Sequence, residues 1–225
     1  MYIKEIELYN FRNYKEQKVS FSEGVNIFIG KNAQGKTNLL EGIYLNAFGK
    51  SFKSVKDKEL IRFGEEYCRI KSISENEDGE NTTEIVIKND GRKGIKKDGI
   101  KIKKSSELLD RIYIIIFSPE DLRIVKDEPE KRRKFINREL CQIRAGYLAD
   151  LNDYNKILKQ RNTYLKEKQI DSDLLDIWDR QLAASGTRII RKRKQFIEKI
   201  DEISNFDFNT AIKEAIEKEV QRRFS

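Results

Sequence analysis

The residues best suited to chemistry in this sequence lie between Gly30 and Asn38, which read G-K-N-A-Q-G-K-T-N. Gly30, Gly35, Lys36 and Thr37 have the spacing of the G-x-x-x-x-G-K-[ST] loop, whose backbone N–H groups surround a phosphate. Glycines at both ends allow the tight turns that such a loop requires. The lysine can reach the outer phosphates of a nucleotide, and the threonine hydroxyl can bind Mg²⁺. The pattern predicts a nucleotide-phosphate site, with a glycine-rich turn that merely caps a helix as the alternative.

The flanking residues supply the strand and helix that this loop needs. Alternating apolar and charged residues predict strands at 2–9 and 16–21, and the apolar run 25–29 predicts a third strand leading into the loop. After Lys36, apolar residues recur at helical spacing as far as Gly49, which predicts a helix that packs on the sheet. The positive N-terminal end of this helix would add to the binding of an anion.

The middle of the chain has a different pattern. Residues 67–104 form short alternating runs separated by Asp-Gly pairs, which favour tight hairpin turns and predict an antiparallel meander. Residues 112–117 are continuously apolar and predict a strand buried on both faces. Ser118, with Pro119 and Asp121 after it, predicts the start of a helix.

Beyond Pro129 the sequence predicts helices almost throughout. Apolar residues recur at helical spacing from 130 to about 203, and the break at 168–172 predicts two antiparallel helices that form an arm. An amphipathic helix is predicted within 206–225. We therefore expect an α/β protein, with a lobe of mixed sheet and antiparallel meander at 1–128, an inserted helical-hairpin arm at 129–204, and a return helix at 205–225.

Composition limits the possible functions. The 225 residues contain 46 Lys and Arg against 38 Asp and Glu, a net charge of +8 that is compatible with a polyanionic partner. Histidine is absent, which excludes catalysis by histidine and metal sites with histidine ligands. Cys68 and Cys141 have no metal-binding spacing and predict a reducing, cytoplasmic environment. No apolar run has membrane-spanning length, so we expect no membrane partner.

The positive charge is concentrated in two stretches. Residues 88–104 contain eight basic and two acidic residues, a net charge of +6, and residues 188–199 contain six basic and one acidic residue, a net charge of +5. Either stretch could contact nucleic-acid phosphates, and either could simply be a solvated face. The candidate DNA-binding residues are Lys53, Arg92, Lys93, Lys96, Lys97, Lys101, Lys103, Lys104, Arg191 and Arg193.

With these motifs placed, the chain resembles the RecF family of ABC/SMC-like ATPases over nearly its whole length. The resemblance rests on L-Y-N-F-R-N-Y (8–14), the loop and helix at 30–44, G-K-S-F-K (49–53), F-S-P-E-D-L-R-I-V-K (117–126), P-E-K-R-R-K-F-I-N (129–137), Y-N-K-I-L-K-Q-R-N-T-Y-L-K (154–166) and W-D-R-Q-L-A (178–183). SMC-type ATPases share the first two motifs, whereas the last four in this order are specific to RecF.

The resemblance implies a P-loop ABC-type ATPase head that binds ATP and Mg²⁺ and dimerises head to head when ATP is bound. It also implies binding to double-stranded DNA and to single-/double-strand junctions, and action with RecR and RecO in directing RecA to gaps. The implied nucleotide-binding residues are Gly30, Lys31, Asn32, Ala33, Gln34, Gly35, Lys36, Thr37 and Asn38, together with Arg12; Thr37 is the implied Mg²⁺ ligand. An exposed arginine at a strand end is the alternative for Arg12.

The sequence also departs from the family. Lys53 stands where arginine is usual and Asn137 where aspartate is usual, and the Q-loop region 118–121 has no glutamine. No Walker B acidic pair and no signature motif occur, so we expect the chain to be C-terminally incomplete and slow or unable to hydrolyse ATP. No catalytic residue is predicted within the chain. The alternatives are the head of another SMC-like ATPase, or a basic DNA-binding scaffold with a vestigial nucleotide site.

Overall fold

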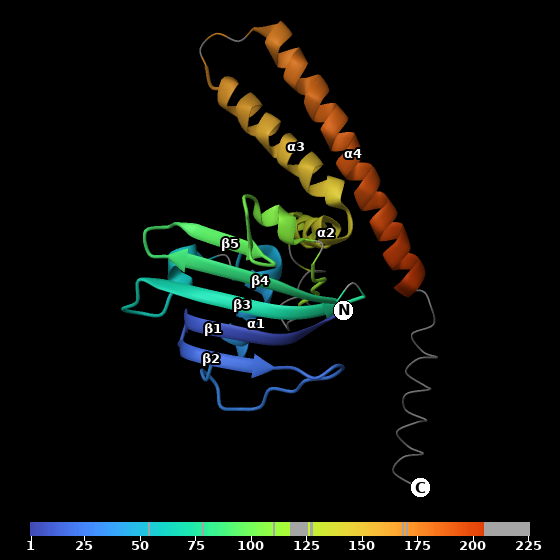
Figure 1. Cartoon of the computed structure of the whole chain (residues 1–225). Coiled ribbons are helices and arrows are strands. Elements are labelled where there is room, and N and C mark those ends of the chain that lie inside the picture. Colours follow the sequence, from blue (N-terminus) through green and yellow to red (C-terminus); the bar gives the residue numbers. More distant parts are fainter. Residues whose placement is uncertain are drawn as a thin grey trace. The chain divides into compact units, whose positions relative to one another are not determined.

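The computed structural model describes residues 1–53, 55–77, 79–109, 111–117, 126, 128–167, 169 and 171–204. The chain divides into two compact units, Met1–Arg123 and Ile124–Ser225 (Figure 1). The first unit contains the predicted phosphate loop, and the second contains the predicted arm.

The first unit is built on a six-stranded sheet. Its strands are β1 (Tyr2–Phe11), β2 (Tyr14–Ser20), β3 (Tyr67–Asn76), β4 (Gly79–Lys88), β5 (Lys93–Lys97) and β6 (Ile100–Ile102). Their order is β2-β1-β3-β4-β5-β6, and each neighbouring pair is antiparallel. The predicted strands 2–9 and 16–21 and the predicted meander are confirmed. The expectation of a mixed sheet is wrong for the described residues, because every pairing there is antiparallel.

The sheet has one apolar face and one charged face, as expected from alternation along each strand. The buried side chains Leu8, Ile70, Ile85 and Ile95 lie opposite one another in successive strands. The residues next to these in sequence point to the opposite face, where a row of charged residues crosses all six strands. That row is Lys18, Glu7, Lys71, Glu84, Lys96 and Lys101 in spatial order. Charges of opposite sign alternate along it until two lysines meet on β5 and β6.

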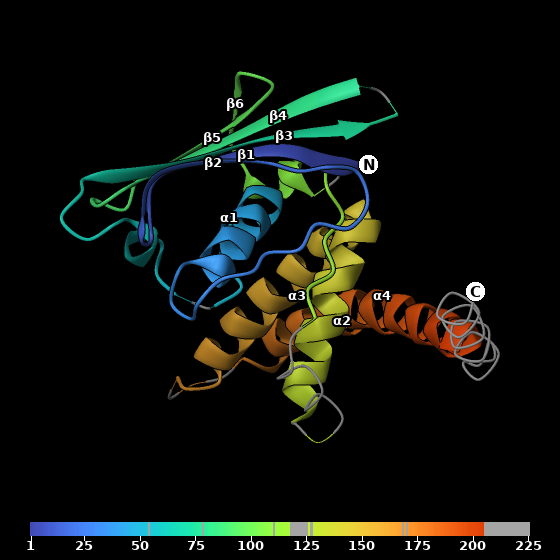
Figure 2. The same ribbon diagram turned by 90° about the horizontal axis from the view of Figure 1, so that it is seen from below.

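Helix α1 (Lys36–Phe48) packs against the apolar face of the sheet (Figure 2). Gly42 permits the close approach, because a Cβ at this position would lie 2.8 Å from Cδ2 of Leu8. The helix ends at Gly49, which has a φ of +67° and donates its N–H to the carbonyl of Leu45. Both predicted ends are confirmed. This packing fixes the first turn of α1, and with it the phosphate loop, beside the ends of β1 and β2.

Two predicted strands are not strands in the structure. Residues 25–29 have no sheet partner among the described residues, and Val25, Ile27 and Ile29 are largely exposed. Residues 112–117 also lack a described sheet partner. In this segment the even-numbered Ile112, Ile114 and Ile116 pack against α1 beside Tyr44 and Phe48, whereas the odd-numbered side chains are exposed. The apolar residues therefore predicted burial correctly only for the even-numbered positions of 112–117. They did not predict strand formation, because a strand also requires a neighbouring strand with which to pair.

The second unit contains three described helices, α2 (Pro129–Ile143), α3 (Ala145–Tyr164) and α4 (Ser172–Ser204). The predicted boundary at Pro129 and the two antiparallel helices on either side of the break near 168–172 are confirmed, and α2 is a further helix that the sequence analysis did not separate. Arg144 has an extended backbone that separates α2 from α3. The predicted helix start at Ser118 and the predicted return helix lie outside the described residues.

Helices α3 and α4 run antiparallel and side by side (Figure 1). Tyr164 stacks edge-on against Trp178 near their connection, and Arg161 pairs with Asp179. Farther along, Asp150 of α3 pairs with Arg188 and Lys192 of α4. The two helices are therefore linked along much of the length of α3. Among the described residues, no helix is both long and apolar enough to cross a membrane.

Candidate functional site

The loop between Gly30 and Lys36 is closed by its own side chains. The Nζ of Lys36 donates to the carbonyl oxygens of Gly30 at 2.6 Å and Lys31 at 2.8 Å. The side-chain oxygen of Gln34 accepts from the N–H of Lys31 at 3.0 Å. Ala33 and Gly35 have positive φ values of +66° and +106°, so the backbone reverses direction within the loop. The Lys36 side chain thus lies across the mouth of the loop, where it was predicted to bind the phosphates of a nucleotide.

The start of α1 offers unpaired donors to an anion. The first hydrogen bond of the helix joins the N–H of Leu39 to the carbonyl of Gly35 at 2.9 Å, so the N–H groups of Lys36, Thr37 and Asn38 precede the helical pattern. No side chain caps this end, and its first turn contains no acidic residue. The positive end of a 13-residue helix therefore has no negative side chain of its own in the first turn.

Two residues of the β1–β2 turn hold the loop in place. A Cβ added to Gly35 would lie 2.7 Å from Oη of Tyr14 and 2.9 Å from Nδ2 of Asn13. Asn13 also accepts a hydrogen bond from Nδ2 of Asn38 at 2.9 Å. The positive φ favours glycine at this position, and a larger residue would also have to displace the ends of the Asn13 and Tyr14 side chains.

Arg12, predicted to bind nucleotide, pairs with Glu41 of α1 in the structure. Its Nε donates to Oε2 of Glu41 at 2.9 Å and its terminal nitrogen to Oε1 at 2.7 Å, a two-pronged contact. The other terminal nitrogen donates to the carbonyl of Glu59 at 2.9 Å. Lys53, predicted to bind DNA, also pairs with Glu41, at 3.0 Å from Oε2. Ser51 Oγ donates to Oε1. We call Arg12, Glu41, Ser51 and Lys53 the Glu41 cluster.

The Glu41 cluster contains a fully buried carboxylate, with 0% of Glu41 exposed. Burial alone would raise the pKa of Glu41, but hydrogen bonds from Arg12, Ser51 and Lys53 outweigh burial and lower the pKa below its ordinary value. The carboxylate is therefore ionised at neutral pH. Sequence reasoning missed Glu41 and Ser51. The signal in the sequence was a charged residue, Glu41, next to the apolar positions of the predicted helix.

The basic stretch 88–104 is partly neutralised by acidic neighbours. Arg92 pairs with Asp90, Lys93 with Asp57 at 2.9 Å, and Lys96 approaches Glu84 at 3.6 Å. The Nζ of Lys97 donates to the carbonyl of Glu107 at 3.2 Å. Four lysines of the stretch are exposed and take part in no described ion pair. These are Lys88, Lys101, Lys103 and Lys104. We call them the hairpin lysines.

The basic stretch on α4 serves mainly to hold the arm together. Arg188 and Lys192 share Asp150 at 2.6 and 2.7 Å. Arg193 donates to Oη of Tyr147 at 3.1 Å and to Oδ1 of Asn137 at 2.9 Å, inside the unit. Of the two α4 residues predicted to bind DNA, only Arg191 is exposed. The described contacts of Arg193 lie within the arm.

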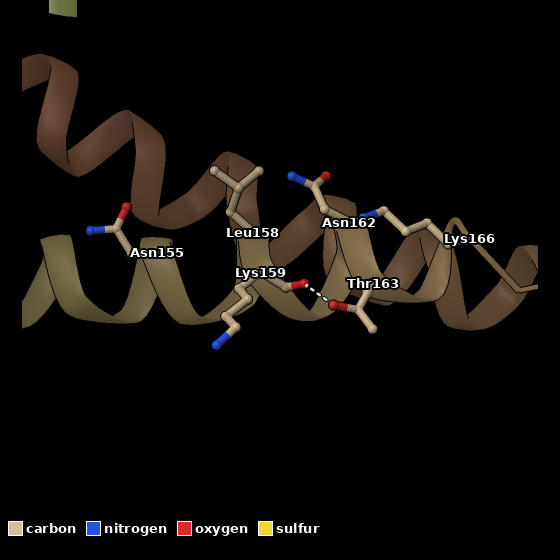
Figure 3. Close-up of a pocket in the computed structure, with 6 residues that line it drawn as sticks. All are labelled: Asn155, Leu158, Lys159, Asn162, Thr163 and Lys166. Carbon is tan, nitrogen blue, oxygen red and sulfur yellow. Dashed lines mark hydrogen bonds between the residues drawn. The ribbon is translucent and has the colours of Figure 1, made fainter.

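A hollow of about 460 Å³ lies along α3 (Figure 3). Five of its lining residues come from α3 and the sixth, Lys166, follows the end of that helix: Asn155, Leu158, Lys159, Asn162, Thr163 and Lys166. The Thr163 hydroxyl donates to the carbonyl of Lys159, so it is already engaged. The lining contains two lysines and no acidic side chain. In the part of the chain that the structure describes, no three His, Cys, Asp or Glu side chains are grouped to hold a metal ion.

Sequence comparisons relate the chain to known proteins. The family model described as AAA domain matches residues 5–223. The chain is 47% identical over 206 residues to the DNA replication and repair protein RecF of Agathobacter rectalis, covering 90% of this chain and 57% of that protein. It is 46% identical over 202 residues to RecF of Clostridium botulinum, covering 89% and 56%. The chain thus spans little more than half the length of the curated relatives that it matches.

Solved structures show the same relationship. One described as the recombination mediator RecF–ATP in the RecFOR pathway superposes with a TM-score of 0.83 at 44% identity, covering 88% of this chain and 54% of that one. An SMC ATPase structure, from work on ATP-driven dimerisation and DNA-stimulated activation, has a TM-score of 0.52 at 26% identity and covers 61% and 98%. The chain therefore belongs to the AAA-domain family, and within it is a relative of the DNA replication and repair protein RecF.

Proposed function

We propose that this chain is the ATP-binding lobe of an ATP-dependent DNA-binding protein of recombinational repair. The observation that carries the proposal is the start of α1, where unpaired N–H groups follow a loop whose lysine lies across its mouth. The relative at 44% identity whose structure is described as RecF–ATP supports ATP as the ligand.

In this proposal Lys36 exchanges partners when ATP binds. Its ammonium group turns from the carbonyls of Gly30 and Lys31 toward the β- and γ-phosphates, while the N–H groups of residues 31–36 and the helix N-terminus surround the phosphate oxygens. Thr37 is exposed in the first turn, so its hydroxyl fits the Mg²⁺ that accompanies ATP. When bound, this ion neutralises charge on the outer phosphates.

For the complete protein we propose a head-to-head dimer that forms with ATP and separates after a slow, DNA-stimulated hydrolysis. The described relative belongs to the RecFOR pathway, which supports RecR and RecO as partners and RecA loading at gaps, in the cytoplasm, as the outcome. ATP-driven dimerisation and DNA-stimulated activation are described for the SMC relative. Separation after hydrolysis follows if the dimer interface requires the γ-phosphate.

We propose that the hairpin lysines, rather than the basic residues of α4, contact the phosphates of double-stranded DNA and its junctions. Lys96 and Lys101 face each other on β5 and β6, and repulsion between them is relieved when an anion binds. Arg188, Lys192 and Arg193 on α4 already have partners within the arm, so recruiting them to DNA would break those contacts.

Titration with a fluorescent ATP analogue tests the nucleotide site. Lys36→Met should weaken ATP binding by roughly tenfold or more, because a charge-assisted contact contributes about 1.5–3 kcal/mol. Lys15→Ala, which removes an exposed lysine of β2, is the matched control and should bind as the parent chain does. Equal ATP affinity in the folded Lys36→Met variant would overturn the assignment of the loop.

A further inference from the structure

We propose that Glu41 is a positioning residue for the nucleotide site: it fixes Arg12 and Lys53 beside the phosphate loop so that both cations favour the outer phosphates of ATP. This inference rests on the proposed function. It adds to that function a buried carboxylate that belongs to neither the loop nor the ligand.

The first argument is saturation of the carboxylate. Oε1 accepts from Arg12 and Ser51, and Oε2 accepts from Arg12 and Lys53. Four donors thus occupy a group that is wholly removed from water. Burying a carboxylate is costly unless it is paired and fully hydrogen-bonded, and such pairing holds its partners in one geometry. Arg12 is held most tightly, because its planar guanidinium makes two parallel contacts.

The second argument is the excess of positive charge. Two cations surround one anion, so the Glu41 cluster carries a net charge of +1. The Arg12 and Lys53 side chains remain 18% and 32% exposed, whereas Glu41 is not exposed at all. The unneutralised positive charge therefore lies on the accessible side of the cluster, where a phosphate can approach. The Glu41 carboxylate is buried, so it does not come into contact with that phosphate.

The third argument is the connection to the phosphate loop. Besides Glu41, the Nζ of Lys53 donates to Oδ1 of Asn38 at 3.1 Å. Asn38 lies in the first turn of α1 and donates in turn to Asn13, which packs against Gly35. Glu41 follows Thr37 by four residues and so lies one turn below it on the same side of the helix. Through Lys53 and Asn38, hydrogen bonds thus connect the carboxylate to Asn13, the residue that packs against Gly35 at the end of the loop.

The test compares ATP and ADP affinities in variants of the cluster. Glu41→Gln keeps the shape of the side chain but replaces one acceptor oxygen with an amide group, which cannot accept from Lys53 or Arg12. We expect ATP affinity to fall roughly tenfold, the loss of about one charge-assisted contact, while ADP affinity changes less than ATP affinity. Glu41→Asp should recover part of the ATP affinity. Glu16→Gln, on the exposed side of β2, is the matched control.

A second variant separates position from charge and guards against misfolding. Glu41→Gln raises the net charge of the cluster to +2, whereas Glu41→Gln combined with Lys53→Met restores the cluster's original net charge of +1 without its carboxylate. If Glu41 positions Arg12, the double variant binds ATP more weakly than Lys53→Met alone, which lacks the same lysine but keeps the carboxylate. If net charge alone matters, its ATP affinity returns to that of the parent chain and the proposal is overturned. Equal losses for ATP and ADP would likewise overturn it, because they would indicate a general loosening of α1.

The outcome for the parent chain distinguishes this inference from the proposed function. A parent chain that binds neither ATP nor ADP would refute the nucleotide site itself. A parent chain that binds ATP and a folded Glu41→Gln variant that binds it equally well would refute only the role of Glu41.

Discussion

Replacing Gly35 with alanine combines two separable penalties, and other glycines in the same unit isolate each one. Gly35 has a φ of +106°, and a Cβ there would lie 2.7 Å from Oη of Tyr14. Gly64 has a φ of +85° with nothing within 4 Å of the added Cβ, so Gly64→Ala measures backbone strain alone. Gly42 has no positive φ but contacts Leu8, so Gly42→Ala measures crowding alone.

The expected magnitudes follow from these positions. A positive φ costs an L-residue about 1–2 kcal/mol, and the restricted unfolded chain returns about 0.4–1 kcal/mol. Gly64→Ala should therefore cost about 0–1.5 kcal/mol of unfolding free energy. Crowding in a packed site adds about 1–3 kcal/mol, so Gly35→Ala should cost about 1–4 kcal/mol. Gly42→Ala should cost about 0–2 kcal/mol, because alanine gains about 1 kcal/mol in a helix interior.

Unfolding in urea can be followed separately in the two units. Cys68 of β3 is wholly buried, so labelling of its thiol in increasing urea reports opening of the first unit. Trp178 is the one tryptophan in the sequence and lies in α4, so its fluorescence reports on the second unit. Gly35→Ala should lower the midpoint for Cys68 labelling and leave the Trp178 midpoint unchanged. A Gly35→Ala variant no less stable than Gly64→Ala would show that Asn13 and Tyr14 do not hold the loop.

Three further outcomes are expected. Burial raises the pKa of the Cys68 thiol to about 12, so the native chain at pH 8 should resist alkylation there until it unfolds, as mass spectrometry of the labelled peptide would show. Hydrogen bonds from Lys192 and Arg188 lower the pKa of Asp150; this contribution to stability is therefore present above the unfolded pKa and is lost as pH falls through the lower folded value. Asp150→Asn should consequently reduce the acid sensitivity of the Trp178 transition and lower its urea midpoint at pH 7. Reversing the charges of Lys101, Lys103 and Lys104 should weaken duplex binding, whereas reversing those of Arg191 and Lys199 should not. The slope of log affinity against log salt should become shallower by roughly 0.9 for each DNA phosphate that the first variant no longer neutralises.

The phosphate loop could be predicted from sequence because its geometry is local. Gly30, Gly35 and Lys36 are contiguous with the helix that they precede, and glycine and lysine each impose a specific constraint there. Similarly, Asp-Gly pairs indicated the turns of the meander. In each case a few neighbouring residues determine the conformation, so no knowledge of distant contacts was required.

The Glu41 cluster could not be predicted, because its members meet only through the tertiary fold. Arg12 comes from the end of β1, Glu41 from α1, and Ser51 and Lys53 from the segment that follows α1. The sequence predictions for Arg12 and Lys53, nucleotide for the first and DNA for the second, gave no indication that the two cations share one buried partner. Likewise, the runs 25–29 and 112–117 show a preference for burial without showing which strand would pair with them.

The linked helices of the arm have a mechanical consequence. At 1.5 Å per residue, the 33-residue α4 is about 50 Å long, and the Asp150 and Arg161 ion pairs join it to α3 along its side. Two helices joined in this way resist bending better than either does alone, so a force applied near Trp178 is transmitted along the arm instead of being absorbed by it. A rotation of about 10° at one end of such a rod displaces the other by about 9 Å.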